Sequence, residues 1–188
     1  MPARDPVSLK AMNADNVGLQ VEFAWRQDRH RHTISLLVDD CANTVFESFE
    51  GSSVDDWPPS PPLQQLSVEE LRPQSQVALL VGMAGKSHWS ISVEPAGDRA
   101  AFVFDVACRS NGPAERLGSA YLLPADQLAA NGDHHAVIEI EGRSIQLRCD
   151  REGATAAAVK VDPSGLWIAP TVINAGGTTR WRYTIELL

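Results

Sequence analysis

The histidines are the residues of this chain best suited to metal chemistry. His30 and His32 form an H-x-H pair, and on a strand this spacing points both imidazoles to one face, where they can bind the same metal ion. His88 and His134 each begin a strand and would be able to complete the set. The carboxylate that such a pair often uses is absent, because leucines stand four and five residues after His32. A metal-dependent enzyme using His30 and His32 is therefore one alternative function.

The faces on which these histidines fall argue against one shared site. Alternation places His32 and His134 in apolar rows, whereas His88 lies on the polar face of its strand, opposite Trp89. Side chains on opposite faces of a sheet do not meet at one ion. The sequence therefore predicts no metal ion and no cofactor, and it leaves His30, His32, His88 and His134 as candidate binding residues.

The stretch 79–90, LLVGMAGKSHWS, contains Gly-Lys-Ser after an apolar run, as a phosphate-binding loop does. The motif G-x-x-x-x-G-K-[ST] requires a glycine at position 80, which is Leu80. The loop must also open a helix, whereas the following SHWSISVE alternates as a strand. We interpret Gly-Lys-Ser as a turn between two strands, with Lys86 in solvent.

The cysteines do not form a recognisable reactive site. Cys41, Cys108 and Cys149 are widely spaced and include no C-x-x-C pair. Cys108 and Cys149 fall on apolar faces, which predicts buried, unreactive thiols. No G-x-S-x-G motif occurs. No catalytic residue is identified, and the sequence favours a non-catalytic protein.

The acidic residues are concentrated in one interval. No lysine or arginine lies between His32 and Arg72, and the eight acidic residues there equal the net charge of −8: Asp39, Asp40, Glu47, Glu50, Asp55, Asp56, Glu69 and Glu70. Nucleic-acid-binding proteins carry a basic patch instead, so we expect no nucleic-acid partner. An interaction protein that binds a protein partner through the acidic, proline-rich region 39–70 is a second alternative function.

The same interval holds one long irregular stretch at 51–66, GSSVDDWPPSPPLQQL. Four prolines within five residues cannot supply the N–H groups of a sheet. Their PxxP spacing fits a polyproline ligand, but no basic residue flanks them. We interpret the stretch as a stiff loop across one end of the domain with Trp57 beneath it, and Trp57 is a further candidate binding residue.

Period-two alternation of apolar and polar side chains is the strongest pattern in the chain. It predicts strands at 19–26, 32–38, 89–94, 102–108, 145–149 and 180–187. The stretch 77–83 is apolar on both faces, which predicts a central strand covered on both sides. A proline at one end and Asn-Gly at the other predict a short helix at 124–130.

These elements predict an all-β fold, an antiparallel β-sandwich or flattened barrel of about 10–12 strands with that one helix. We expect a flexible N-terminal segment at 1–16 and a single β domain at 17–188, with the loop at 51–66. The N-terminus lacks an apolar signal core, and no apolar run reaches the roughly 18 residues of a membrane span. We therefore expect a cytoplasmic protein without membrane contact, whose favoured function is non-catalytic binding of a protein partner or small ligand.

Replacing Lys86 by alanine tests the interpretation of the Gly-Lys-Ser stretch. An exposed turn residue contributes little, so Lys86→Ala should change the free energy of unfolding by no more than about 0.5 kcal/mol in chemical denaturation. Equilibrium dialysis with ATP measures whether the wild type and Lys86→Ala bind a nucleotide. A nucleotide affinity that Lys86→Ala abolishes would restore the phosphate-loop interpretation.

Overall fold

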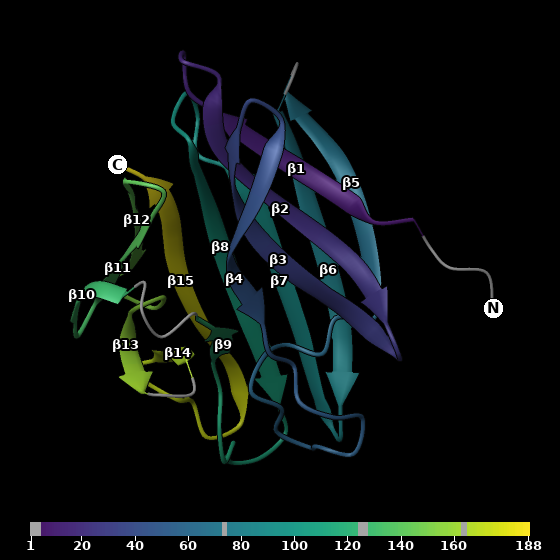
Figure 1. Cartoon of the computed structure of the whole chain (residues 1–188). Coiled ribbons are helices and arrows are strands. Elements are labelled where there is room, and N and C mark those ends of the chain that lie inside the picture. Colours follow the sequence, from purple (N-terminus) through teal and green to yellow (C-terminus); the bar gives the residue numbers. More distant parts are fainter. Residues whose placement is uncertain (1–4, 73–74, 124–127, 163–164) are drawn as a thin grey trace.

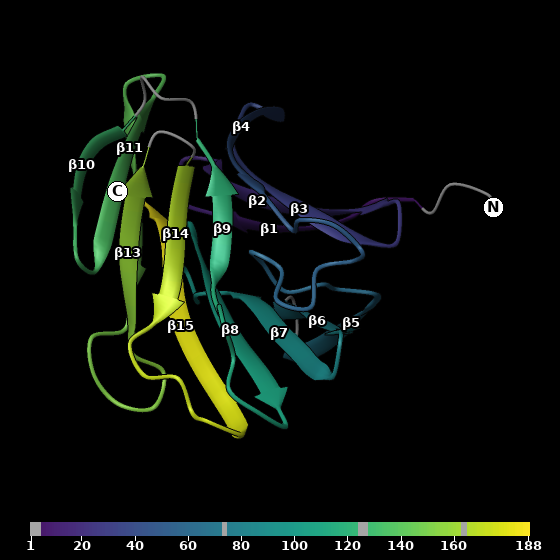
Figure 2. The ribbon, with the colours of Figure 1, turned by 90° about the horizontal axis from the view of Figure 1, so that it is seen from below.

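The computed structural model describes residues 5–72, 75–123, 128–162 and 165–188. Every regular element within these ranges is a β-strand, so the fold is all-β, as the alternation predicts. The strands form two antiparallel sheets that pack together (Figures 1 and 2). The molecule is therefore a β-sandwich, and the flattened barrel is not formed.

The two sheets differ in size by one strand. The seven-stranded sheet has the spatial order β1 (Val7–Met12), β2 (Val17–Arg26), β3 (Arg29–Val38), β4 (Cys41–Ser48), β9 (Ser119–Leu122), β14 (Gly165–Pro170) and β13 (Ala157–Asp162). The eight-stranded sheet has the order β10 (Leu128–Gly132), β11 (His135–Ile140), β12 (Arg143–Cys149), β15 (Gly177–Leu187), β8 (Ala101–Ser110), β7 (Ser87–Pro95), β6 (Ser75–Ala84) and β5 (Gln65–Arg72). Most neighbours in sequence are hairpin partners, which explains why the links between strands are short.

The strand count and the helix prediction need correction. The described ranges contain fifteen strands rather than 10–12, because short strands such as β9 show too few residues for a clear alternation. The predicted helix at 124–130 is wrong at 128–130, where the chain pairs with β11 as part of β10; residues 124–127 lie outside the described ranges. Hydrogen bonding to β11 decides this conformation in place of local helix propensity.

The N-terminal region also differs from the expectation. Val7–Met12, which we expected within a flexible segment, forms the edge strand β1 and pairs with β2 over its whole length. Leu9 and Ala11 point into the core and are buried. Alternation over the three apolar positions Val7, Leu9 and Ala11 was too short a signal to predict this strand.

The core lies between the inner faces of the two sheets and includes the tryptophans that alternation placed inside. Trp89 and Trp181 are 2% and 0% exposed, and their rings meet edge to face with centroids 6.1 Å apart. Trp89 Nε1 donates to Ser87 Oγ at 2.9 Å, and Trp181 Nε1 donates to Ser119 Oγ at 3.0 Å. Burial of both indoles is therefore compatible with their polar N–H groups.

The loop at 49–64 connects β4 in one sheet to β5 in the other and covers one end of the sandwich, at the bottom of Figure 1. Residues 58–63 are all buried. The Ser60 hydroxyl donates to the Ala120 carbonyl at 3.1 Å and accepts the Ala120 N–H at 2.7 Å. The predicted loop across one end is confirmed at 51–64, whereas Gln65 and Leu66, which we expected within it, begin β5. Its buried prolines belong to the fold and do not form an exposed polyproline ligand.

Replacing Trp89 by alanine tests the packing of this core. Removing a fully buried aromatic ring leaves a cavity, so Trp89→Ala should lower the free energy of unfolding by about 3–5 kcal/mol. Urea denaturation measures the loss. Val172→Ala, at a side chain that is 69% exposed, is the control and should change stability by less than about 0.5 kcal/mol. Equal, small effects of the two substitutions would contradict the core assignment.

Candidate functional site

His30 and His32 are core residues on the inner face of β3, with 6% and 3% of their surface exposed. His32 Nε2 lies 2.9 Å from the Tyr121 hydroxyl, and burial lowers the pKa of His32 to about 3, so its ring is neutral. His30 packs edge-on against Trp25 with ring centroids 5.0 Å apart. The H-x-H pair shares a face, as predicted, but that face is the packed interior.

The other predicted candidates lie apart from this pair. His88 is exposed on the outer face of β7, as predicted. His134 is half-buried next to β11, with Nδ1 2.9 Å from the Ala157 carbonyl oxygen, and Trp57 is half-buried in the loop at 49–64. Within the described ranges no three His, Cys, Asp or Glu side chains gather as metal ligands. The metal-dependent alternative therefore has no ligand set in this part of the chain.

The acidic interval does not form one surface. Asp39 and Asp40 lie in the turn between β3 and β4, whereas Asp55 and Asp56 lie in the loop at 49–64, at the other end of the sandwich (Figure 1). Glu50 is buried. The charge of the interval is thus divided among separate places on the fold.

Glu50 carries the most unusual environment in the molecule. It is 1% exposed, accepts a hydrogen bond from the Ser48 hydroxyl, and has its Oε2 3.4 Å from Arg31 Nε. Arg29 Nη1 donates to the backbone carbonyl of Glu50 at 3.1 Å. Burial raises the pKa of Glu50 to about 7, because the cost of a buried charge outweighs the help from Ser48 and Arg31.

A chain of hydrogen bonds near this carboxyl joins the two sheets. The Tyr121 hydroxyl on β9 lies 2.7 Å from the Tyr183 hydroxyl on β15 and also contacts His32. Burial raises the pKa of both tyrosine hydroxyls, so they stay protonated at neutral pH. A substrate would have to open the core to reach these groups, since both tyrosines are at most 1% exposed. Their role is to hold the sheets together.

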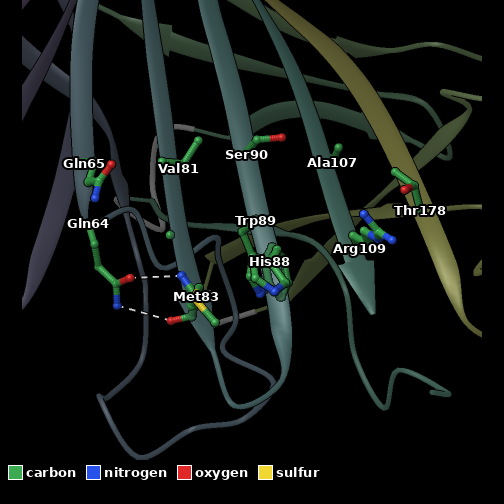
Figure 3. Close-up of a pocket in the computed structure, with 11 residues that line it drawn as sticks. Gln64, Gln65, Val81, Met83, His88, Trp89, Ser90, Ala107, Arg109 and Thr178 are labelled. Carbon is green, nitrogen blue, oxygen red and sulfur yellow. Dashed lines mark hydrogen bonds between the residues drawn. The ribbon is translucent and has the colours of Figure 1, made fainter. Parts of the chain in front are cut away.

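The described surface offers an accessible site on the outer face of the eight-stranded sheet. Figure 3 shows this groove, which has a volume of about 460 Å³ and runs over β6, β7 and β8. Its floor is made by the small side chains of Ser90 and Ala107, which are register partners. Val81 and Met83 on β6 form one wall, and they are 46% and 48% exposed. The size difference between neighbouring outward side chains creates the depression.

The opposite wall carries positive charge. The register places His88 beside Arg109, and Arg109 beside Thr178 of β15. Arg109 makes no side-chain ion pair with another described residue, whereas Arg180 binds Asp105 at 2.7 Å. An unpaired guanidinium can receive a carboxylate or phosphate through two parallel hydrogen bonds. The groove therefore joins an apolar wall to an available cation.

Gln64 closes the groove beside β6. Its side-chain amide accepts the Met83 N–H at 2.9 Å and donates to the Met83 carbonyl at 3.2 Å, as the dashed lines in Figure 3 show. This bidentate pair prolongs the ladder between β5 and β6. Gly82 permits the loop to come this near, because a Cβ at that position would lie 1.7 Å from the Pro62 carbonyl oxygen. Local packing of the loop thus fixes one boundary of the groove.

The groove does not follow from the amino-acid sequence of 77–83, whose apolar residues predicted burial on both faces of the strand. The prediction of a strand covered on both sides is wrong, since Leu79, Val81 and Met83 project from the outer face of β6 and are 40–48% exposed. The signal in the sequence that could have indicated the groove was the pairing of apolar Leu79 and Val81 on one strand with Ser92 and Ser90 on the next. Only the two strands of the hairpin taken together show it.

Comparison of the chain with protein-family models, curated proteins and solved structures found no match. The part of the chain that the structure describes has no helix of the length and apolar character that crossing a membrane requires. The function of the groove must therefore be argued from its own residues.

Replacing Glu50 by glutamine tests the burial of this carboxyl through pH. Its pKa is about 7 in the folded chain against an ordinary 4.5, so the folded state holds the proton more tightly. The wild type therefore loses stability as pH rises from 4.5 through 7. Glu50→Gln has no carboxyl to ionise, so its stability should not fall in this way. The free energy of unfolding of Glu50→Gln minus that of the wild type should therefore increase by about 2–3 kcal/mol between about pH 5 and pH 8.

Urea denaturation across that pH range measures the difference. His32 affects stability in the opposite direction, because its lowered pKa removes stability as pH falls from 6.5 towards 3. Both proteins contain His32, so its contribution cancels in the difference between them. Glu47→Gln removes an exposed carboxyl of β4, three residues before Glu50, and is the matched control. A stability difference between wild type and Glu50→Gln that does not change with pH would contradict the raised pKa.

Proposed function

We propose that this chain is a non-catalytic binding domain that holds a small anion with an apolar part in the groove over β6, β7 and β8. The observation that carries the proposal is the pair of unlike sides, with the apolar Val81 and Met83 on β6 and the cationic Arg109 on β8. Between them lie the exposed His88 and, one outward position along, the small side chains of Ser90 and Ala107. The anionic group would receive charge-assisted hydrogen bonds from Arg109. The apolar part would cover Val81 and Met83 and remove their surface from water. This burial stabilises the complex by about 25 cal/mol for each Å² of apolar surface.

The dimensions and polar groups of the groove support a small ligand. Its volume of about 460 Å³ falls within the roughly 300–1,000 Å³ of small-molecule sites. Gln64, Ser90 and Thr178 add hydrogen-bonding side chains around an otherwise apolar surface. This combination orients a ligand without supplying a reactive group.

The reactive residue types of the chain favour binding over catalysis. Burial raises the pKa of Cys108 and Cys149 to about 12, so neither thiol is a nucleophile at neutral pH. His32 is neutral and buried beside Tyr121. His88 is the histidine of the groove, and the groove-lining residues include no serine–histidine–carboxylate arrangement.

Hexanoate is a suitable first probe because it combines a carboxylate with an apolar chain. Titrated into ¹⁵N-labelled protein, it should shift the amide resonances of β6, β7 and β8. Arg109→Gln should weaken binding roughly tenfold, since charge-assisted hydrogen bonds contribute about 1.5–3 kcal/mol. Ser90→Phe should fill the floor of the groove and abolish binding without unfolding the protein, because Ser90 is exposed.

Matched controls separate the groove from the rest of the sheet. Arg148→Gln removes an exposed arginine of the eight-stranded sheet outside the groove, and Ser92→Phe alters the next outward position of β7. Both should leave hexanoate affinity unchanged. Equal affinity for hexylamine, or resonance shifts spread over both sheets, would refute the proposal.

A further inference from the structure

The groove is one end of a longer track along β7. The outward side chains of β6 form an exposed apolar row of Leu79, Val81 and Met83. Beside this row the outward residues Ser90 and Ser92 of β7 are small. The apolar row therefore stands above its neighbour strand at Leu79 and Val81, whereas Met83 lies beside His88.

Arginines border the other side of the track. Ser90 is paired with Ala107 of β8, which is paired with Arg180 of β15; Ser92 is paired with Asp105, which is paired with Arg182. Arg109 on β8, and Arg180 and Arg182 on the next strand β15, thus belong to three successive outward rows of the sheet. These rows are about 6.6–6.8 Å apart along the strands. The apolar row on β6 has the same spacing.

The charge available here is opposite to that of the whole chain. Both Asp105 oxygens accept hydrogen bonds from Arg180 Nη2, at 2.9 and 2.7 Å. Arg109 and Arg182 have no such partner among the residues described. A protein of net charge −8 therefore presents two unpaired guanidinium groups along one side of an exposed apolar row. Glu94, the next outward residue of β7 after Ser92, marks the end of the track.

We propose that this track binds an extended segment of a partner protein in which apolar and acidic side chains alternate, an inference that rests on the proposed function of the groove. Alternate side chains of an extended chain point to opposite sides and repeat every 6.6–6.8 Å or so. A segment parallel to β7 would place its apolar side chains against Leu79, Val81 and Met83. Its carboxylates would then meet Arg109 and Arg182 in the same register.

The charge pattern favours a peptide over a nucleic acid. A polynucleotide repeats its phosphates without apolar groups between them, so it would leave the β6 row exposed. Single-stranded nucleic-acid sites also use aromatic side chains for base stacking. Among the residues that line the groove, the one Phe, Tyr or Trp is Trp89, and it is only 2% exposed. An acidic, apolar segment satisfies both sides of the track.

Synthetic peptides test the inference directly. An octapeptide of alternating leucine and glutamate should bind the full chain in isothermal titration calorimetry. A tetrapeptide of the same pattern, too short to reach both ends, should bind at least fivefold more weakly. An octapeptide of alternating leucine and lysine should not bind, and equal binding of the two octapeptides would overturn the proposal.

Variants at the far end of the track distinguish this inference from the groove itself. Leu79→Ser and Arg182→Gln should each weaken the leucine–glutamate octapeptide at least fivefold and leave hexanoate affinity unchanged. Arg148→Gln and Leu122→Ser, at exposed positions outside the track, are the matched controls. Amide spectra of each variant establish that it is folded.

The outcomes separate the two proposals. If Arg109→Gln weakens hexanoate but the far-end variants leave octapeptide affinity unchanged, the track is refuted and the groove stands. If the octapeptide and hexanoate both fail to bind, both proposals fall. Binding of a single-stranded ten-nucleotide DNA that Arg109→Gln and Arg182→Gln weaken, without octapeptide binding, would assign the track to nucleic acid instead.

Discussion

The passage of the chain from one sheet to the other through residues 49–64 is the constraint on which the other features depend. A segment that crosses the end of the core must satisfy its backbone polar groups within the fold. The Ser60 hydroxyl meets Ala120, and the Leu63 carbonyl accepts the N–H of His30 at 2.6 Å. The same loop buries Glu50 at its start and sets Gln64 against Met83 at its end. The buried network and the boundary of the groove thus have one origin.

The distribution of charge follows from that burial. Inside, His32 is kept neutral and the pKa of Glu50 is raised, because a charge in the core loses its hydration. The two tyrosine hydroxyls hydrogen-bond to each other between the sheets, and that of Tyr121 also contacts His32. Residue types that often perform chemistry are here part of the structural core. The cation that lines the groove is Arg109, on the outer face, where water and solutes reach it.

Alternation within a single strand carried much of the fold prediction. It placed Trp89, Trp181, Cys108 and Cys149 inside and His88 outside, and the structure confirms each placement. The Gly-Lys-Ser stretch forms the hairpin turn between β6 and β7, with Gly85 at a φ of 53° that suits glycine. These features depend on the alternation of side chains along a strand and on the backbone preferences of single residues. Both can be read from a short stretch of sequence.

The amino-acid sequence by itself therefore determined the all-β class, the inner row of most strands and the proline-rich loop. The tertiary structure alone decided that β1 and β10 pair as strands, because their hydrogen-bond partners lie on other strands. It also decided that the H-x-H pair is enclosed and that the outer row of β6 is left exposed. Whether a face is covered depends on which other segments pack against it, and no single strand encodes that. The groove exists only because β6, β7 and β8 lie side by side in one register.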